Sequence, residues 1–233
     1  MRVVLYFINW EDSFYFPFIK EHYGKFCERI VMGDNNSSDN SVELAKQLGF
    51  EIVKFGGAQL NDQHYLDFKN NIWKECRGKG IDYVIVCDAD EFVIIPNLKL
   101  SEAAPECEGY NMISETLPKK SIFEINEGSY SESYSKQVVF SPDRIQEMNY
   151  VHGCHKNNKI LFSPDPWDKR DSIKLYHYRQ IGGVQRMIDR HALYRARMSA
   201  FNSKHQMGFH YNHSDNAKVD EWNYLKTQAV KLW

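Results

Sequence analysis

Strand-like and helix-like segments alternate along the first ninety residues of this 233-residue chain. Each of the first three apolar runs is followed by a helical segment that ends near a glycine. The predicted strands are residues 2–8, 27–34, 50–55 and 82–90. Such alternation with short links predicts a parallel sheet with right-handed crossovers, and therefore an α/β fold. A chain of this length can form one sizeable domain.

The pattern changes after Pro96. Short strand-like runs with polar, Pro- or Gly-containing links follow at 109–116, 136–142, 148–155, 158–164 and 172–178. Helical patterns then cover 182–200 and 217–232. Since no linker or repeat interrupts the chain, we expect one domain over 1–233 with a mixed central sheet. It would comprise an α/β half (1–100), a strand-rich half (101–200) and a C-terminal helical extension (201–233).

Three acidic residues, Asp88, Asp90 and Glu91, follow the fourth predicted strand. Because burying an unpaired carboxylate is costly, this strand end needs a cation. Carboxylates suit Mg²⁺ or Mn²⁺, and Mg²⁺ typically borrows phosphate oxygens from its ligand. Asn9 and Asp34 follow two other predicted strands at the same edge, where α/β sheets bind ligands. The Asp-x-Asp sequence in this position predicts a site for a nucleoside diphosphate.

Composition excludes several other classes of protein. The formal net charge of −2 gives no bias toward nucleic acid or an anionic membrane. The five cysteines contain no CxxC pair, which argues for a reducing compartment and against a zinc ribbon. No signal-peptide pattern is present, and no run reaches the ~18 apolar residues of a transmembrane helix. We therefore expect a cytoplasmic protein without a nucleic-acid partner.

Four segments together resemble the glycosyltransferase family 2-like group of GT-A enzymes, particularly small polysaccharide transferases with a DADEF motif. They are INWEDSFYFPFIKEHYG (8–24), DNNSSDNSVELAKQLG (34–49), DQHYLDFKNN (62–71) and DYVIVCDADEF (82–92). Beyond residue 130 the resemblance is patchier, although KQVVFSPDRI, HGCHK and LYHYR are similar to the tail of such enzymes. The resemblance implies a Rossmann-like GT-A fold. Its first half would bind a nucleotide sugar, and its second half would complete the metal site and bind the acceptor.

The resemblance also implies roles for residues near the strand ends. The nucleotide-sugar donor would be bound by Asn9, Glu11, Asp34, Asp39, Gln63 and Asp88. Asp88 would face the ribose or the metal, and Asp90 would be the firmer ligand of Mn²⁺ or Mg²⁺. The residues themselves leave structural alternatives open. These are an Asx-turn for Asp34, a helix N-cap for Asp39 and a supporting position for Glu91.

Residues of the second half would complete the site. By the same resemblance, His155 and His177 would be further metal or phosphate ligands, and the alternative for each is an ordinary core or surface histidine. Candidates for the base that deprotonates the acceptor hydroxyl are Glu124, Asp143 and His155. Five arginines form a basic cluster that would contact the diphosphate, an anionic acceptor or a membrane surface, or form a solvated helix face. They are Arg179, Arg186, Arg190, Arg195 and Arg197.

The expected function is metal-dependent sugar transfer from a UDP- or GDP-sugar to a glycan or lipid-linked acceptor. Such a reaction would serve surface polysaccharide synthesis, with at most peripheral contact at the inner membrane face. Two alternatives remain. A haloacid-dehalogenase-type phosphatase or phosphotransferase also uses Asp-x-Asp after a strand, although that superfamily places it on the first strand. A non-catalytic nucleotide-sugar-binding protein would keep the fold without turnover.

Overall fold

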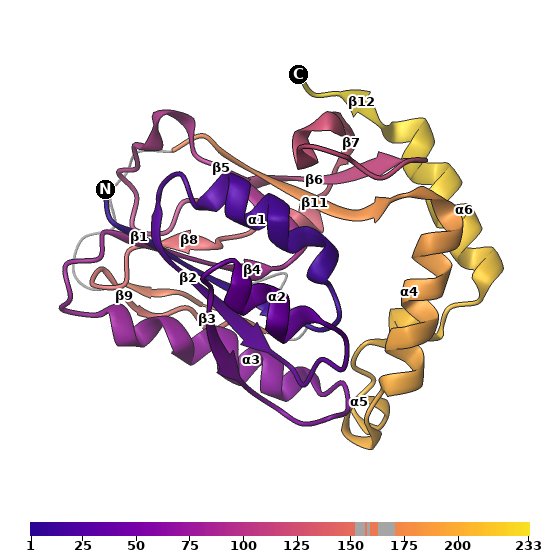
Figure 1. The fold of residues 1–233 in the computed structure, drawn as a ribbon, viewed down its shortest axis with the longest axis horizontal. Coiled ribbons are helices and arrows are strands. Elements are labelled where there is room, and N and C mark those ends of the chain that lie inside the picture. Colours follow the sequence, from indigo (N-terminus) through magenta and orange to yellow (C-terminus); the bar gives the residue numbers. More distant parts are fainter. Residues whose placement is uncertain (152–156, 158, 163–170) are drawn as a thin grey trace.

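The computed structural model describes residues 1–151, 157, 159–162 and 171–233. A five-stranded sheet in the order β3-β2-β1-β4-β8 forms the centre of the first half (Figure 1). Its strands are β1 (Val3–Asn9), β2 (Cys27–Asp34), β3 (Glu51–Lys54), β4 (Tyr83–Asp88) and β8 (Val139–Phe140). Strands β1 to β4 are parallel, and β8 runs antiparallel to β4. The carboxyl ends of β1, β2 and β4 therefore meet at one edge.

Helices cover both faces of this sheet. They are α1 (Phe16–Tyr23), preceded by the 3-10 turn η1 (Ser13–Tyr15), α2 (Ser41–Gln47), and α3 (Asp62–Asn71) with the 3-10 turn η2 (Ile72–Cys76). Successive side chains of a strand face opposite sides. Leu5 and Phe7 accordingly join the core that includes α1 and α2, whereas Val4 and Tyr6 join the core that includes α3 and η2. All of β1 is buried, which explains its continuous apolar run.

Local side-chain chemistry sets the helix boundaries. Asn61 caps α3, since its side chain accepts a hydrogen bond from Gln63 N at 3.0 Å. Gly49 follows α2 with a φ of 77°, a conformation that favours glycine. The helical segment that the sequence predicts after the third strand is α3 followed by η2 rather than one continuous helix. Asn71 donates from Nδ2 to Asp67 O at 2.8 Å, and this side-chain bond accompanies a backbone φ of −124° that interrupts the α-helix.

A second five-stranded sheet, in the order β12-β7-β6-β11-β5, forms the centre of the other half. Its strands are β5 (Glu91–Ile94), β6 (Cys107–Ser114), β7 (Glu127–Tyr130), β11 (Ile173–Ile181) and β12 (Val230–Lys231). Strands β6 and β11 are parallel, and the other neighbours are antiparallel. The short strands β9 (Ile145–Glu147) and β10 (Leu161–Phe162) pair with each other. The connections contain the 3-10 turns η3 (Pro96–Leu98), η4 (Ile122–Glu124) and η5 (Glu132–Tyr134).

The C-terminal helices, orange to yellow, lie along the right-hand side of the molecule in Figure 1. They are α4 (Gly183–Arg197), α5 (Ala200–Lys204), the 3-10 turn η7 (Phe209–Asn212) and α6 (Asp215–Gln228). A small apolar core joins α4 and α6 to β6 and consists of Ile113, Met187, Trp222 and Leu225. A β-bridge between Leu60 and Met198 ties this region to the loop before α3. Within the described residues, no helix is long and apolar enough to cross a membrane.

The predicted α/β class with both parallel and antiparallel pairing is confirmed, and the four N-terminal strands lie where the sequence predicts them. The strands divide into two sheets because β5 leaves β4 after Asp88 and pairs with β11. The predicted strand over 148–155 is described only in part, and its Tyr150 forms an isolated bridge with Asn157. The predicted strand over 158–164 is reduced to β10 in the described residues, and its partner β9 was not predicted.

Candidate functional site

The connection from β4 to β5 carries the chain from one sheet into the other. Asp88 ends β4, and Glu91 begins β5. Strand β5 pairs with β11 in a register that sets Glu91 opposite His177. Tyr178 N, also on β11, donates to Asp90 O at 2.8 Å. The turn from Asp88 to Asp90 therefore lies against a strand that is distant in sequence.

Glu91 supports this turn from the protein interior. Its Oε1 accepts a hydrogen bond from Lys136 Nζ at 2.6 Å, and its Oε2 accepts one from Asp88 N at 3.0 Å. The side chains of Lys136 and Glu91 are 1% and 0% exposed. Both charges have lost their hydration, so the pair depends on this close geometry. These contacts agree with the alternative in which Glu91 supports the Asp-x-Asp turn instead of binding a ligand.

His177 approaches Asp90 from β11, with its Nε2 3.6 Å from Asp90 Oδ2. The other ring nitrogen, Nδ1, lies 2.9 Å from Asn111 Oδ1 and must donate, because a carbonyl oxygen only accepts. That leaves Nε2 as the ring nitrogen that faces the Asp90 carboxylate. Tyr134 stacks on the ring with centroids 3.9 Å apart. A second contact that fixes the tautomer is typical of a metal-binding histidine.

The spacing of Asp90 and His177 fits a shared divalent ion. Metal–ligand bonds of about 2.1 Å place two neighbouring ligand atoms roughly 3–3.6 Å apart. The observed 3.6 Å is within this range and longer than a hydrogen bond. Carboxylates suit Mg²⁺ and Mn²⁺, whereas imidazole suits transition metals, so the pair favours Mn²⁺. In the part of the chain that the structure describes, no three acidic, His or Cys side chains gather as a metal-binding group.

Buried cations hold the two carboxylates of the Asp-x-Asp sequence in their ionised form. The Nζ of Lys69, a 2%-exposed lysine on α3, lies 2.9 Å from Asp88 Oδ1. Burial opposes ionisation of Asp88, but Lys69 and Lys136 outweigh it and keep the pKa of Asp88 below its ordinary value. Burial likewise opposes ionisation of Asp90. There His177 and Arg179 keep the pKa of the carboxyl well below its ordinary value.

Asp12 supplies a further carboxylate from the loop after β1. Its Oδ1 lies 2.6 Å from an Arg190 guanidinium nitrogen. Arg179 Nη1 lies 3.5 Å from both Asp12 Oδ2 and Asp90 Oδ2. Burial raises the pKa of Asp12 despite the two arginines. Arg179 thus bridges the N-terminal loop and the Asp-x-Asp turn.

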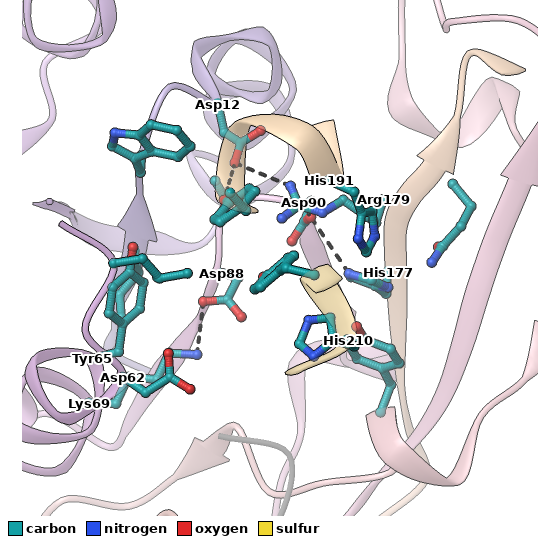
Figure 2. Close-up of a pocket in the computed structure, with 18 of the residues that line it drawn as sticks. Asp12, Asp62, Tyr65, Lys69, Asp88, Asp90, His177, Arg179, His191 and His210 are labelled. Carbon is teal, nitrogen blue, oxygen red and sulfur yellow. Dashed lines mark hydrogen bonds and ion pairs between the residues drawn. The ribbon is translucent and has the colours of Figure 1, made fainter. Parts of the chain in front are cut away.

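A cavity of about 210 Å³ is lined by Asp12, Lys69, Asp88, Asp90, His177 and Arg179, among others. Figure 2 shows Asp62, Tyr65 and Lys69 on one side of it and His177, Arg179 and His210 on the other. The charged residues of its lining are five carboxylates and two full cations. They are Asp12, Asp62, Asp88, Asp90 and Glu221, with Lys69 and Arg179. Asp12 and Glu221 are paired with Arg190 and Lys218, two cations outside this lining.

Three of the predicted site residues, Asp88, Asp90 and His177, line this cavity together. The other predicted donor ligands do not line it: Asn9, Glu11, Asp34, Asp39 and Gln63. Asn9 and Asp34 are paired across β1 and β2 at the strand ends, and both are buried. Asp34 Oδ1 accepts from Ser37 N at 3.2 Å, while its buried Oδ2 has no hydrogen-bond partner among the described residues. Their roles toward a nucleotide remain predictions.

Glu11 and Asp39 have local partners in the loops that follow β1 and β2. Glu11 Oε1 accepts from Ser38 Oγ at 2.5 Å. Asp39 Oδ1 accepts from Ser41 N at 3.0 Å, at the first residue of α2. This contact agrees with the capping alternative for Asp39, although the backbone N-cap position is Asn40. Gln63 donates to Asp67 along α3 at 2.8 Å.

The predicted bases Glu124 and Asp143 also lie outside the cavity lining. Glu124 accepts hydrogen bonds from three backbone nitrogens between residues 119 and 121 and forms a capping box with Ser121. Asp143 accepts from Gly78 N at 2.7 Å. Both carboxylates thus have structural partners, and their catalytic role remains a prediction. His155 lies outside the described residues.

Several cavity residues were not singled out from the sequence: Asp12, Asp62, Tyr65, Lys69, Tyr134, His191, Tyr194, His210, Tyr211 and Glu221. Arg179 was noted only as part of a basic cluster. The strand period of two places it on the same face as His177, and this signal was present in the sequence. Lys69 had no comparable signal, because a lysine on a helix is ordinarily exposed.

Two histidines of the cavity are expected to make stability depend on pH. Burial, with a smaller effect of Lys218, lowers the pKa of His191 to about 3 and that of His210 to about 4. The unfolded chain restores a pKa of about 6.5, so it binds more protons than the folded protein below that pH. Stability is therefore present above about pH 6.5 and lost as the pH falls toward 4. Urea denaturation should show a loss of about 1.4 kcal/mol per pH unit from His191 alone.

The matched variants for this prediction are His191→Phe and His205→Phe. The first removes a buried titrating group and should flatten the pH dependence of the unfolding free energy. The second changes an exposed histidine on the surface of the protein and should leave the slope as it is. Equal slopes for the wild type and His191→Phe would show that His191 titrates normally in the folded protein.

Comparison with known proteins gives a limited result. No family model matches this chain, and no curated protein matches it. Among solved structures, it is similar to glucosyl-3-phosphoglycerate synthase from Mycobacterium tuberculosis in complex with Mn²⁺, uridine diphosphate and glucosyl-3-phosphoglycerate. The match has 16% identity and a TM-score of 0.29, and it covers 47% of this chain and 43% of that one. The chain thus matches less than half of that enzyme's length, too slight a likeness to assign an activity.

Proposed function

We propose that this protein is a divalent-metal-dependent glycosyltransferase of the GT-A type. It transfers a sugar from a nucleoside-diphosphate donor, a UDP- or GDP-sugar, to a glycan or lipid-linked acceptor. The reaction belongs to surface polysaccharide synthesis, in the cytoplasm or at the inner face of the membrane. One observation carries the proposal. Asp90 and His177 present a carboxylate oxygen and an imidazole nitrogen 3.6 Å apart at the carboxyl edge of a parallel sheet.

The carboxylates of the Asp-x-Asp turn support a metal-bound diphosphate rather than a free anion. Asp88 and Asp90 both line the cavity, and the pKa of each is held below its ordinary value. A diphosphate alone would be repelled by these two carboxylates, whereas its complex with a divalent ion can be accommodated. An ion held by Asp90 and His177 would supply charge neutralisation of the diphosphate leaving group. Arg179, whose Nη1 lies 3.5 Å from Asp90 Oδ2, is a cation of the cavity lining that would contact the same phosphates.

The remaining residues would either bind the nucleotide-sugar donor or support the Asp-x-Asp turn. Asp88, at the end of β4, would face the ribose or the metal, with its carboxylate oriented by Lys69. Asn9, Glu11, Asp34, Asp39 and Gln63 remain proposed ligands of the nucleoside. During transfer, the bond from the anomeric carbon to the phosphate oxygen breaks, a bond to the acceptor oxygen forms, and the acceptor hydroxyl loses its proton.

The proposal is tested by the melting temperature of the protein with UDP or GDP, each with Mn²⁺ or with EDTA. We expect stabilisation by one nucleotide in Mn²⁺ that EDTA removes. Binding at a hundred times the Kd adds about 2.7 kcal/mol to the free energy of unfolding. Absence of any Mn²⁺-dependent shift with both nucleotides would overturn the metal-dependent donor site. Binding without turnover of nucleotide sugars would favour the non-catalytic alternative.

A further inference from the structure

Arg197, the last residue of α4, is buried among the loops that follow β1, β2 and β3, and it is 9% exposed. Its Nη2 donates to Asn35 O at 2.7 Å, and its Nε donates to Ala58 O at 2.8 Å. The central carbon of its guanidinium lies 4.3 Å from the centre of the Trp10 ring. Arg197 therefore lies inside the protein and is not part of a solvated helix face.

The place that Arg197 takes is the one expected for the base of a nucleotide donor. Trp10 and Asn35 directly follow Asn9 and Asp34, the proposed nucleoside ligands at the carboxyl edge of the first sheet. A nucleobase is planar, stacks on aromatic rings and forms hydrogen bonds along its edge. The guanidinium is also planar, lies over an aromatic ring and donates to two main-chain oxygens. It thus makes the kinds of contact that a base would make there.

The cavity lined by Asp90 and His177 adjoins Arg197. Trp10 and Tyr65 line this cavity, and both contact Arg197, whose Nη1 lies 3.4 Å from Tyr65 Oη. The cavity volume of about 210 Å³ is below the roughly 300–1,000 Å³ of pockets that hold drug-sized ligands. A nucleoside diphosphate with a sugar attached is at least of that size, so the donor needs more space. Withdrawal of Arg197 would extend the cavity toward the ends of β1 and β2.

The chain around Arg197 is attached by hydrogen bonds to the loop before α3 (Figure 1). Leu60 N donates to Arg197 O at 2.9 Å, and Ser199 N donates to Leu60 O at 3.0 Å. The α-helix has ended here, since Met198 has a ψ of 128°. Such bonds contribute little net free energy, because water can replace either partner. Residues 197–199, which we call the latch segment, can therefore separate from this loop while α4 stays folded.

We propose that Arg197 occupies the nucleobase subsite of the unliganded protein, and that donor binding displaces Arg197 together with the latch segment. This proposal rests on the proposed transferase function and adds where the base binds and what moves before it binds. The C-terminal half then holds the protein closed toward its own donor. Because only the open form binds, the apparent Kd equals the intrinsic Kd divided by the open fraction.

The first test is Arg197→Met, which removes the charge and the hydrogen bonds but keeps an unbranched side chain. The apparent Kd for UDP or GDP in Mn²⁺, measured by calorimetry, should fall about tenfold, the equivalent of one hydrogen bond in the latch. A structural role of Arg197 predicts the opposite change, because disordered loops bind a ligand more weakly. Arg2→Met is the matched control. Arg2 also donates to two main-chain oxygens, but it lies at the amino end of β1, and its variant should leave the Kd unchanged.

A reversible cross-link tests whether the main chain moves. Leu60 and Met198 are partners in the bridge, and neighbouring strands lie about 4.8 Å apart, within the roughly 4.4–6.8 Å that a disulfide spans between Cα atoms. Oxidised Leu60→Cys/Met198→Cys protein should bind UDP or GDP in Mn²⁺ at least about tenfold more weakly than the same protein after reduction with dithiothreitol. The wild type should bind equally well before and after reduction.

The outcomes separate this inference from the proposed function. Absence of Mn²⁺-dependent binding in both the wild type and the reduced double variant would overturn the transferase and the latch together. If the wild type binds, and Arg197→Met binds equally or more weakly, the latch is wrong and the transferase stands. Equal affinity of the oxidised and reduced double variant would also overturn the latch. Tighter binding by Arg197→Met and weaker binding by the oxidised protein support it, and the cross-link decides alone if Arg197→Met does not fold.

Discussion

Replacing Asp90 by asparagine is expected to abolish the stabilisation of this protein by a nucleoside diphosphate in the presence of Mn²⁺. The substitution keeps the size of the side chain but removes the negative charge that sits 3.6 Å from His177 Nε2. A divalent ion would lose its carboxylate ligand, and a diphosphate would lose the cation that joins it to the cavity. Differential scanning fluorimetry with UDP and GDP, in Mn²⁺ and in EDTA, measures the effect. The apparent Kd should rise at least about tenfold, or about 1.4 kcal/mol.

Two controls make this result specific to Asp90. EDTA added to the wild type should reproduce the variant, because both treatments remove the same ion. Glu43→Gln removes a carboxylate from the exposed face of α2 and should retain the full Mn²⁺-dependent shift. Circular dichroism of the Asp90→Asn protein establishes that it is folded. An unchanged Mn²⁺-dependent shift in the folded variant would exclude Asp90 from the metal site.

Replacing Lys136 by methionine is expected to produce a large loss of stability. The change leaves Glu91, whose side chain is 0% exposed, as a buried carboxylate without its 2.6 Å ion-pair partner. Removing one partner of a buried pair typically costs about 3–5 kcal/mol. Guanidinium denaturation would measure this cost as a lower free energy of unfolding. Because Glu91 also accepts from Asp88 N, the Asp-x-Asp turn should lose order and nucleotide affinity should fall as well.

A matched surface pair and a double variant test this explanation. Lys25 and Glu21 form an ion pair at 3.5 Å with side chains that are 68% and 41% exposed, so Lys25→Met should cost less than about 1 kcal/mol. Glu91→Gln combined with Lys136→Met removes both charges and should be less destabilised than Lys136→Met alone. A double variant as unstable as the sum of its two single variants would argue against a buried charge as the cause.

The parts of the site that the sequence predicts are those that depend on local pattern. Asp88 and Asp90 come at the end of a continuous apolar run, the pattern of a strand buried on both faces. In the structure this run forms β4. His177 lies within the strand-like run 172–178 of the second half, which the structure describes as β11. Strand ends can be read from sequence because hydrophobicity and turn residues mark them.

The other parts of the site depend on contacts that no local pattern records. Lys69 is on a helix, where a lysine is ordinarily solvated, and its burial depends on the proximity of α3 to Asp88. His191, His210 and Glu221 come together only after three C-terminal elements have packed. The division into two sheets was missed for the same reason. The apolar run after Asp90 is compatible with either sheet, and its pairing with β11 is a long-range choice.

Because β5 pairs with β11, substitutions in the apolar core could alter the geometry of the proposed metal site without contacting a ligand. The same register that sets Glu91 opposite His177 also sets Phe92 opposite Tyr176 and Val93 opposite Leu175, and these four aromatic and aliphatic side chains are buried. A shift of one residue would turn His177 to the other face of its strand. The distance between Asp90 and His177, the two proposed metal ligands, is therefore maintained by hydrophobic packing. Substitutions at these interior positions would change the affinity for the proposed metal ion before they disrupted the fold.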